Sequence, residues 1–588
     1  MTHAFSSLPV TLGVTGHRDV QDSAQLLALL NDEITAIAQR YPHSPLLALS
    51  SLAEGADRLF AQVAMEKGLP LHVVLPFDKD EYERDFAAST GSVTAFREMY
   101  AYAQQTGGVY CVDTVIPGSE SMLSLTSHPQ GSVYRDLQYA RAGMYLAQRC
   151  HILFALWDGC PARGLGGTAQ VVNFRREGRI QEHDMAQLNA VLPGIKRYLG
   201  QSSLLDVPDT GLVCHIHVRR ENGVYADNAS APSVCWYPPL PTAGKSAPKE
   251  ATGEESWYHS LRQLDELNGR ISQQEAQTAS VDAPHFCHAA FQHVDRLANE
   301  KMVDIRKRYK TIFILAALLA FAGNRVPGDP EHWVVISLTA SLILLFMLAW
   351  SLKRVHRSRA NRKATELRAL AEGLRVQNVW RQAGIARSVS LHYLRRSHDN
   401  IAWVRRAMLS ASIYPRPQSP EELTAALETV KESWVRDQQR YFAGSVKKKE
   451  HRHQTAKRTA FGLFGCGIAI TAVVLASSLT GLFNEHLAHS LHRFNMWGEH
   501  LAEFLIASAA LCAAWAKFLG YEEDIADYQR SADLFSTALE KMEPRTPQYT
   551  PDIDDVQETL FALGIETLQE NARWVARTTG RDVEIIGG

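Results

Sequence analysis

The residues with the clearest chemistry stand in a glycine-rich turn that follows a short apolar run at 151–156. The turn contains Gly164, Gly166, Gly167 and Thr168, and the residues after Thr168 can open a helix. Glycines let the backbone approach a phosphate closely, and the N–H groups and dipole of a helix N-terminus favour negative charge. The stretch therefore suits an anion, although a purely structural turn could have the same composition.

Two earlier turns share this chemistry, because each follows an apolar run and combines small residues with hydroxyl groups or charges. The candidates for ligand contact in the three turns are Thr15, Gly16, His17 and Arg18; Ser50, Ser51, Glu54, Gly55 and Asp57; and Asp158, Gly166, Gly167 and Thr168.

Short apolar runs alternate with amphipathic helical stretches over the first 220 residues. A cap at Asp22 and Ser23 is expected to open the first helix. Strands that alternate with helices predict a Rossmann-like α/β domain with a parallel, doubly wound sheet. The expected strands cover 9–13, 46–49, 71–75, 109–112, 151–156 and 213–218, and the helices lie between them, including an acidic and aromatic stretch at 82–100 and a helix at 133–148.

In a doubly wound sheet the three turns lie beyond the carboxyl ends of the strands, where such sheets bind ligands. Convergence of three polar turns on one edge favours a nucleotide or nucleotide-derived ligand over a purely structural role.

Composition limits the other classes of function. The chain has 588 residues, enough for several domains, and its net charge of −2 argues against binding nucleic acid by bulk charge. The 8 cysteines are scattered without a CxxC pair, which fits a reducing compartment and neither a disulfide framework nor a zinc site. His285, His288 and His293 surround Cys287, but no carboxylate or second cysteine completes a metal site, so an amphipathic helix is expected there. We expect no cofactor, no metal and no signal peptide.

Three segments within 8–220 resemble the SLOG superfamily, a Rossmann-like group that includes the LOG cytokinin-activating phosphoribohydrolases and the DNA-processing protein DprA. The segments are VTGHRDV, then SLAEGADRLFAQVAMEKGLPLHVVLPF, then ALWDG followed by GLGGTAQVV. Family members bind nucleotides or nucleotide-derived signals, with the glycine–threonine turn at the phosphate. The resemblance implies ligand contacts at Gly16, Arg18, Ser51, Glu54, Gly55 and Gly166 to Thr168.

The chain departs from the LOG-type hydrolases at one position that matters for mechanism. Those enzymes carry a catalytic glutamate two or three residues past the threonine of this turn, where this chain has Gln170 and Val171. Neither residue can act as a general acid or base. Glu54 and Asp57 could do such work, but each suits a helix dipole or an ion pair equally well. We therefore expect a sensor, with an enzyme as the alternative.

A stretch rich in Pro, Ser, Gly and Ala at 221–255 predicts a linker. Four apolar runs follow at 311–323, 333–352, 460–483 and 501–520. The second and third are long enough to cross a hydrocarbon core, which needs about 20 residues. The pairing of the runs predicts two transmembrane hairpins with loops at 324–332 and 484–500, and a buried core helix is the alternative for the shorter runs.

Basic residues flank the apolar runs on one side only. They occur at 301–310, 353–359 and 447–458, whereas the two hairpin loops carry only Arg325 and Arg493. Positive charge marks the cytoplasmic side, so both termini are expected there. Beside a span, the run Lys447 to Lys449 suits lipid headgroups better than nucleic acid. The expected domains are 1–220 for ligand binding, a linker at 221–255, a first hairpin within 256–352, cytoplasmic helices at 353–459, a second hairpin at 460–520 and cytoplasmic helices at 521–588.

The segment 353–459 is expected to be helical and cytoplasmic. Aromatic residues at helical intervals predict packing between helices, as at Trp380, Tyr393, Trp403 and Trp434. Glu372 and Arg375 are spaced for an ion pair on one helix face.

Residues from about 260 to 580 resemble the SLATT group, two-span modules found in bacteria beside SLOG sensors and nucleotide-second-messenger synthases. The resemblance rests on the hydrophobic hairpins and on a few aromatic and acidic positions. Members are proposed to be pore-forming effectors in anti-phage conflict systems. The resemblance implies an oligomer in the bacterial inner membrane, gated by a nucleotide-derived messenger such as a cyclic nucleotide or an ADP-ribose derivative, with the lipid bilayer as partner and no nucleic acid.

Two alternatives stay open. One is a membrane-anchored nucleotide hydrolase acting through Glu54 or Asp57, and the other is a transporter or receptor with a regulatory nucleotide-binding domain. A transporter is expected to carry polar or charged residues in mid-span. The second and third apolar runs offer only hydroxyl groups there, at Thr339, Ser341, Thr471 and Ser477.

Overall fold

The computed structural model describes residues 6–86, 89–113, 131–162, 165–178, 180–191, 210–219, 232–238, 253–275, 286–322, 331–358, 360–395, 401–413, 419–481, 485–543 and 552–579. The chain forms two compact units, each built from separate stretches of sequence. Unit 1 comprises Met1–Arg296, Glu366–Leu427 and Gly564–Arg573, and unit 2 comprises Leu297–Thr365, Glu428–Leu563 and Trp574–Gly588. Several long helices contribute residues to both units, so continuous sequence ranges do not describe the packing.

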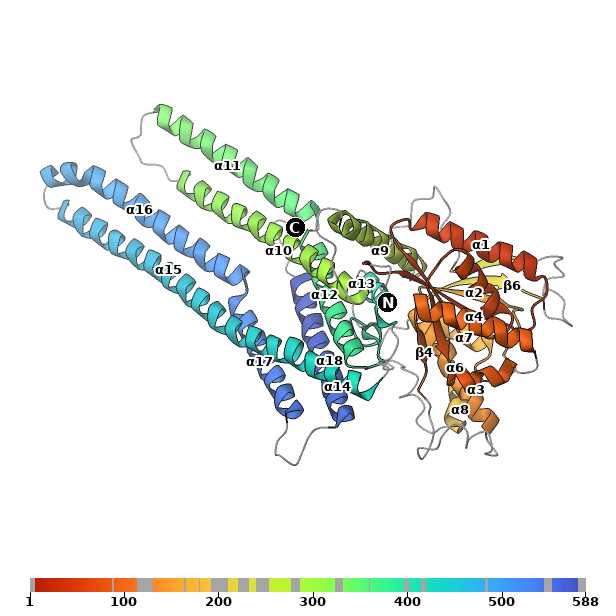
Figure 1. The fold of residues 1–588 in the computed structure, drawn as a ribbon. Coiled ribbons are helices and arrows are strands. Elements are labelled where there is room, and N and C mark those ends of the chain that lie inside the picture. Colours follow the sequence, from red (N-terminus) through yellow and green to blue (C-terminus); the bar gives the residue numbers. More distant parts are fainter. Residues whose placement is uncertain are drawn as a thin grey trace. The chain divides into compact units, whose positions relative to one another are not determined.

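Unit 1 contains an α/β sheet whose strands are parallel except for the last (Figure 1). The strands are β1 (Val10–Gly16), β2 (Leu46–Ser50), β3 (Leu71–Leu75), β4 (Val109–Cys111), β5 (Ile152–Trp157), β6 (Leu212–His217) and β7 (Val234–Tyr237). Their order is β4-β3-β2-β1-β5-β6-β7. The six expected strands are confirmed, because strands buried on both faces are continuous apolar runs. The additional strand β7 lies within the stretch whose composition predicts a linker.

Helices cover both faces of the sheet, as a doubly wound fold requires. They are α1 (Ser23–Arg40), α2 (Ala56–Glu66), α3 (Lys79–Glu83), α4 (Thr90–Thr106), α6 (Gly131–Arg149), α7 (Thr168–Glu177) and α8 (Glu182–Val191). On the α2 face, the rings of Phe60 and Phe154 lie 5.4 Å apart between centroids. On the opposite face, Leu146 of α6 and Val171 of α7 join Leu153 of β5 in one buried core.

The order in which strands are added to the sheet reverses at β1. Strands β2 to β4 follow on one side of β1, and β5 and β6 follow on the other, so β1 and β5 are neighbours. A switch point of this kind leaves a crevice beyond the carboxyl ends of the two strands, and open α/β sheets bind their ligands there.

Two helices of unit 1 contact the opposite, amino ends of the strands. Asn268 donates a hydrogen bond to the backbone carbonyl of Leu8 (2.9 Å). The ring of His151 lies between two partners, with Nδ1 2.7 Å from Thr11 Oγ1 and Nε2 2.9 Å from the carbonyl of Arg406. Burial lowers the pKa of His151 to about 3, so this ring is neutral. The helices are α9 (Gly253–Glu275) and α13 (Ala402–Ala407). Unit 1 also includes α12 (Ala360–Gln382) from Glu366 onward.

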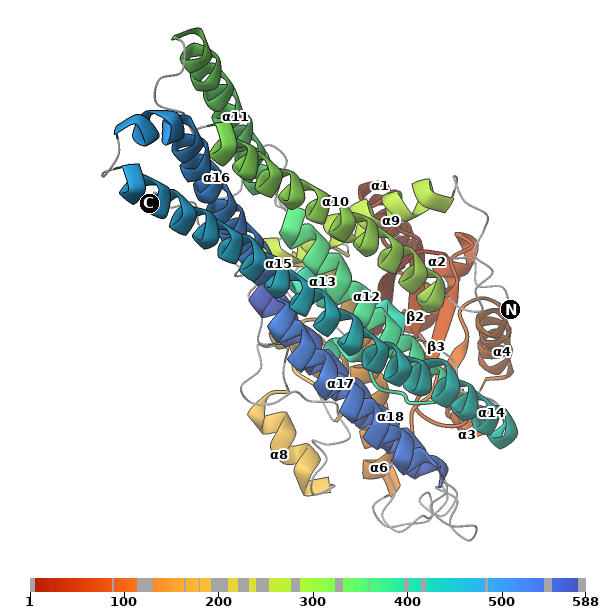
Figure 2. The same ribbon diagram turned by 90° about the vertical axis from the view of Figure 1, so that its left-hand side faces the viewer.

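Unit 2 is built from long helices (Figures 1 and 2). They include all or part of α10 (Phe286–Ala322), α11 (Glu331–Ser358), α14 (Pro420–Val430), a π-helical segment (Lys431–Arg436), α15 (Asp437–Gly481), α16 (Glu485–Phe518), α17 (Tyr521–Met542) and α18 (Ile553–Thr579). Within the described residues, three helical stretches are long and apolar enough to cross a membrane: Val334–Val355, Pro420–Thr480 and Phe494–Met542. Their large apolar side chains are exposed, as at Phe346 (73 %) and Phe461 (74 %). Contiguous apolar exposure of this kind is unusual on a surface that faces water.

Within the described residues, the run at 311–323 is not one of these membrane-length apolar stretches. Its described part is Thr311–Ala322 at the end of α10, twelve residues or about 18 Å of helix, against a hydrocarbon core of about 30 Å. Part of this segment packs inside unit 2, where the ring of Phe313 lies 4.9 Å from that of Trp515.

The structure corrects two local expectations. The expected loop at 484–500 is helical from Glu485 onward, because apolar residues on both sides of Gly498 continue the helix. Of the other expected loop, 324–330 lies outside the described residues. Asp22 is the N-cap residue of α1, as expected, and has the left-handed conformation (φ 58°). Its side chain makes no cap hydrogen bond; the carboxylate accepts a hydrogen bond from Arg219 (3.3 Å).

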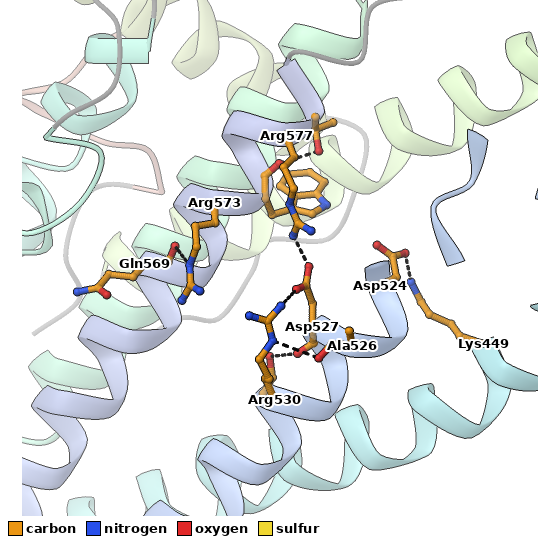
Figure 3. Close-up of polar contacts among 11 residues, drawn as sticks. Lys449, Asp524, Ala526, Asp527, Arg530, Gln569, Arg573 and Arg577 are labelled. Atoms are coloured by element: carbon orange, nitrogen blue, oxygen red, sulfur yellow. Dashed lines mark hydrogen bonds and ion pairs between the residues drawn. The ribbon is translucent and has the colours of Figure 1, made fainter. Parts of the chain in front are cut away.

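Ion pairs join α15, α17 and α18 within unit 2 (Figure 3). Asp527 of α17 accepts hydrogen bonds from Arg530 and from Arg577 of α18, and Asp524 of α17 pairs with Lys449 of α15. These side chains are partly exposed, so each pair contributes at most about 1 kcal/mol. Their main effect is to set the register of the three helices.

The aromatic residues at 353–459 confirm the expectation of helix packing. The side chains of Trp380, Tyr393, Trp403 and Trp434 are buried. Glu372 and Arg375 form the expected ion pair on α12.

Candidate functional site

A cavity of about 560 Å³ lies at the carboxyl ends of β1 and β5 in unit 1. The two strands are paired up to Gly16 and Leu156, and the next residue, His17, donates its backbone N–H to the carbonyl of Leu156 (3.1 Å). The cavity is therefore at the switch point of the sheet. Its volume lies within the usual range of small-molecule sites, about 300–1,000 Å³.

The structure brings residues of all three polar turns to this cavity. The candidates that line it are Thr15, Gly16, His17, Arg18, Ser51, Asp57, Asp158, Gly166, Gly167 and Thr168. The remaining candidates, Ser50, Glu54 and Gly55, do not line it and have contacts behind its wall.

The glycine-rich turn leads directly into a helix that points its N-terminus at the cavity. Gly167 is the N-cap residue of α7, and the helix begins at Thr168. The first N–H groups of a helix have no partner within it and are available to an anion. Gly166 adopts φ +76°, and a Cβ there would lie 2.7 Å from the backbone nitrogen of Ala140, so only glycine fits.

Gln170 holds this turn in place. Its Oε1 accepts the backbone N–H of Gly166 (2.8 Å), and its Nε2 donates to Asp184 Oδ1 (2.8 Å). The Gln170 side chain thus supports the loop.

The second turn is packed against the first through Gly55. This residue has φ +76°, and a Cβ would lie 2.2 Å from the carbonyl oxygen of Arg18. The next residue, Ala56, donates its N–H to the carbonyl of His17 (3.0 Å). Gly55 therefore acts by letting two loops touch.

The other two residues behind the wall also have structural contacts. Ser50 Oγ accepts the backbone N–H of Leu52 (3.0 Å), and the Glu54 carboxylate accepts a hydrogen bond from Ser92. The structure places Glu54 in a contact between loop and helix, which weakens its candidacy as a catalytic base.

Asp57, unlike Glu54, lines the cavity, and the pKa of its carboxyl group is far above the ordinary value. It is the second residue of α2 and is 6 % exposed. Burial raises the pKa of Asp57 to about 7, although backbone N–H groups of Ala53 and Ser51 and the nearby charge of Arg18 favour its ionised form. A carboxyl group that titrates near neutral pH in a cavity can exchange a proton with a ligand.

His17 and Asp158 form a pair across the two central strands. His17 Nε2 lies 3.0 Å from Asp158 Oδ1, and both side chains are 14 % exposed. The pair places an imidazole and a carboxylate beside the helix N-terminus of α7. Such groups can bind the hydroxyl or amino groups of a ligand whose phosphate lies on the helix.

The opposite wall comes from α3 and α6, which sequence reasoning did not include in the site. Tyr82, Asp136 and Tyr139 line the cavity. Tyr139 donates its hydroxyl to Asp85, and Arg135 Nη2 donates to the same carboxylate (2.6 Å). Burial and this contact raise the pKa of Tyr139 to about 12.

A helical period on α6 is the signal that could have identified this wall. Asp136, Tyr139, Gly143 and Leu146 recur at intervals of three or four residues and line the cavity from one helix face. Asp136 and Tyr139 are polar residues on the helix face that packs toward the protein interior, where apolar residues are usual. This exception to the pattern could have indicated a ligand site.

Among the described residues, no group of three or more His, Cys, Asp or Glu side chains is arranged to hold a metal ion. Of the histidine-rich group, His285 lies outside the described residues. His288 Nδ1 lies 3.2 Å from Asn378 Nδ2, and Cys287 Sγ lies 3.7 Å from the carbonyl of Leu374. These contacts are within the helix packing of unit 1.

Comparison of the chain with protein-family models, with curated proteins and with solved structures gives no match.

Proposed function

We propose that the chain is a nucleotide sensor that gates a membrane effector of the SLOG–SLATT kind. The cavity at the β1/β5 edge would bind a nucleotide-derived messenger, and occupancy would shift the membrane helices of an oligomer toward an open or disruptive state. In bacteria, such a response would stop growth of a phage-infected cell. The proposed location is the inner membrane, with four spans and both termini in the cytoplasm.

The observation that carries the proposal is the cavity itself. It joins a helix N-terminus (Thr168), a cation (Arg18) and carboxylates (Asp57, Asp158) at the switch point of a parallel sheet. A phosphate suits the first two, and sugar hydroxyls or base amino groups suit the carboxylates. The volume and the mixture of charges together fit a nucleotide better than a purely apolar or purely anionic ligand.

The membrane part of the proposal is supported by the exposed apolar helices of unit 2. The stretch Val334–Val355 has none of its most apolar window buried. The basic residues beside it, and those at 447–458 in the first half of α15, favour a cytoplasmic location for the termini. The proposed fourth span includes the apolar end of α10, of which Thr311–Ala322 is described.

Helix α7 offers a route by which occupancy reaches other helices of unit 1. Its N-terminus lines the cavity, and Arg175 near its C-terminus is buried and donates to the carbonyl of Cys150 (2.6 Å). The guanidinium of Arg175 also lies 4.9 Å from the ring centroid of Trp257 on α9. Arg406 of α13 lies 4.2 Å from the same ring, so one buried indole contacts both arginines.

A ligand can shift the membrane helices only if it binds one state better than the other. Ordinary coupling between sites is worth roughly 1–3 kcal/mol, which corresponds to a 5–150-fold change in affinity. Four spans are too few for a wide pore in one copy, so the proposal requires an oligomer.

The test is release of dye from vesicles that carry the full chain. Nucleoside monophosphates, cyclic nucleotides and ADP-ribose derivatives would be added separately, and binding would be measured on the same sample. We expect one class to bind and to increase release. Tight binding without any change in permeability would contradict gating.

A second candidate, nucleotide hydrolysis, is favoured by the position and acidity of Asp57. A buried carboxyl group with a pKa of about 7 in a ligand cavity suits general acid or base catalysis. Hydrolysis predicts turnover of the bound nucleotide that Asp57→Asn removes while binding is kept. Absence of turnover at saturating nucleotide would exclude it.

A further inference from the structure

A second cavity, of about 620 Å³, lies wholly within unit 2. It opens between α15 and α16, which run side by side in both views (Figures 1 and 2), and extends to the start of α17. We call it the α15–α16 pocket. Its apolar walls are formed by Ala460, Phe461 and Phe464 on α15 and by Ile506, Ala510 and Ala513 on α16.

The pocket exists because the two helices carry side chains of different size along this stretch. Farther along the pair, Val474 of α15 and Ala502 of α16 are buried. At the pocket, α16 presents alanines, which do not fill the space beside the phenylalanines of α15. Phe461 remains 74 % exposed and Phe464 45 % exposed. The apolar walls of the pocket are therefore not covered by other side chains of the described structure.

The mouth of the pocket is charged. Lys457 and His453 both contact Glu522, at 3.1 and 3.2 Å. Lys517, by contrast, makes no ion pair within the described part of the chain, and it lines the same mouth. Partial pairing therefore leaves one ammonium group available beside an apolar cavity.

We propose that the α15–α16 pocket holds an acyl chain of a bilayer phospholipid, with the phosphate of that lipid at Lys517. The inference rests on the proposed insertion of α15 and α16 in the membrane. Lys457 precedes the apolar run at 460–483, and Lys517 lies near the end of the run at 501–520. Both ammonium groups therefore stand at one boundary of the hydrophobic region, where lipid phosphates lie and where lysine side chains reach toward the interface.

The amphiphilic character of the pocket decides between the possible occupants. A free nucleotide would leave the phenylalanine and alanine walls without an apolar partner. A helix from a second copy would cover those walls, but it would not by itself supply an anion to Lys517. A phospholipid supplies both an acyl chain and a phosphate.

The experiment uses the full chain in vesicles of phosphatidylglycerol and phosphatidylethanolamine that contain a tracer phospholipid with a diazirine on its acyl chain. After illumination, labelled peptides are mapped by mass spectrometry. We expect strong labelling at Phe461 and Phe464. Ala513→Phe fills the pocket and should reduce this labelling, whereas Ala514→Phe, on the neighbouring exposed alanine that does not line the pocket, should leave it unchanged.

The headgroup contact is tested separately by Lys517→Gln, with Lys353→Gln at the end of α11 as the control. Loss of one cation beside an anionic headgroup should lower labelling in the pocket about fivefold. The control should not change it.

Equal labelling in Ala513→Phe and Ala514→Phe, or no effect of Lys517→Gln, would overturn the proposal. Cross-links from Ala513→Cys to a second chain, without lipid adducts in the pocket, would identify a second copy as the occupant and would also overturn it. Failure of membrane insertion is distinguishable, because the exposed face of α11 around Phe346 would then be unlabelled as well.

Discussion

The two cavities are nearly equal in volume, about 560 and 620 Å³, yet their walls have opposite chemistry. The unit 1 cavity is lined by backbone turns, carboxylates, an arginine and an imidazole. The unit 2 pocket is lined by alanine, isoleucine and phenylalanine, with charges only at its mouth. Size alone therefore does not indicate the ligand. What distinguishes the two sites is whether polar groups converge in the interior or remain at the rim.

The difference follows from the elements that build each site. Loops beyond parallel strands carry backbone N–H groups that have no partner in the sheet or helix. A polar ligand can accept hydrogen bonds from these groups. Two paired helices have satisfied backbones, and a gap between them exposes only side chains. A cavity in such a pair is apolar unless its side chains are polar.

Removal of Trp257 should have the largest effect on unit 1. Trp257→Ala leaves a cavity at a buried indole that contacts Arg175 and Arg406, and a buried Trp→Ala change costs about 3–5 kcal/mol. We expect earlier unfolding of unit 1 in denaturant and loss of nucleotide binding, while lipid labelling at Phe461 stays unchanged.

The control is Trp257→Phe, which keeps an aromatic ring and removes an indole N–H that has no hydrogen-bond partner among the described residues. A smaller loss of stability is expected. Equal losses in the two variants would show that the ring contacts with the arginines contribute little.

Substitution of Gly166 should have the next largest effect and should separate strain from site geometry. Gly166→Ala and Gly68→Ala both place alanine at positive φ, but only the first meets a neighbour, the backbone nitrogen of Ala140 at 2.7 Å. Strain of this kind costs about 1–3 kcal/mol. We expect nucleotide affinity, measured by calorimetry, to fall about tenfold or more in Gly166→Ala and to stay unchanged in Gly68→Ala. Equal affinities in the two variants would remove the turn from the site.

The pH dependence of binding tests whether charge in the unit 1 cavity is set by Asp57. Its folded pKa of about 7 lies above the ordinary value of 3.8, so the carboxyl group gains charge as the pH rises through 7. A charged Asp57 repels an anion, so affinity should fall between pH 6 and pH 8.

ADP-ribose is a suitable probe because its pyrophosphate keeps a constant charge in this range. We expect about a fivefold decrease between the two pH values in the native chain and no decrease in Asp57→Asn. A decrease of the same size in both would assign the effect to another group. Stability should fall in the same direction. As the pH rises from about 4 to about 7, the unfolded chain releases the Asp57 proton while the folded state retains it, so the free energy of unfolding decreases.

The smallest effect is expected at Asp527. Its pairs with Arg530 and Arg577 are partly exposed, so Asp527→Asn should change the free energy of unfolding by less than about 1 kcal/mol. High salt should remove most of this difference. A loss well above that value would mean that the ion pairs stabilise unit 2 more than surface pairs usually do.

The sequence predicts the unit 1 site better than the unit 2 pocket, for a physical reason. Strand β3 is an apolar run whose bounds coincide with the expected 71–75, and the residues after such runs must lie at the carboxyl edge. Ten of the thirteen candidates in the three turns accordingly reach one cavity. Glu54 does not, because the direction of a side chain in a turn depends on the tertiary packing of its loop.

Features that depend on packing between distant segments were not predictable in this way. The contribution of Asp136 and Tyr139 depends on how α6 is rotated against the sheet. Strand β7 forms where Val234–Tyr237 pairs with β6, and its composition gives little indication of that. The α15–α16 pocket depends on which alanines of α16 face the phenylalanines of α15. The periodicity of a single helix does not predict this pairing.

Helix α15 is continuous over 45 residues, from Asp437 to Gly481, and so measures about 68 Å along its axis. Its polar first half and its apolar second half form one continuous helix. If one end of α15 is held, a tilt of the helix by about one degree displaces its other end by about 1.2 Å, by simple geometry over that length. Small angular changes at its base are thereby amplified into atomic-scale displacements at its far tip.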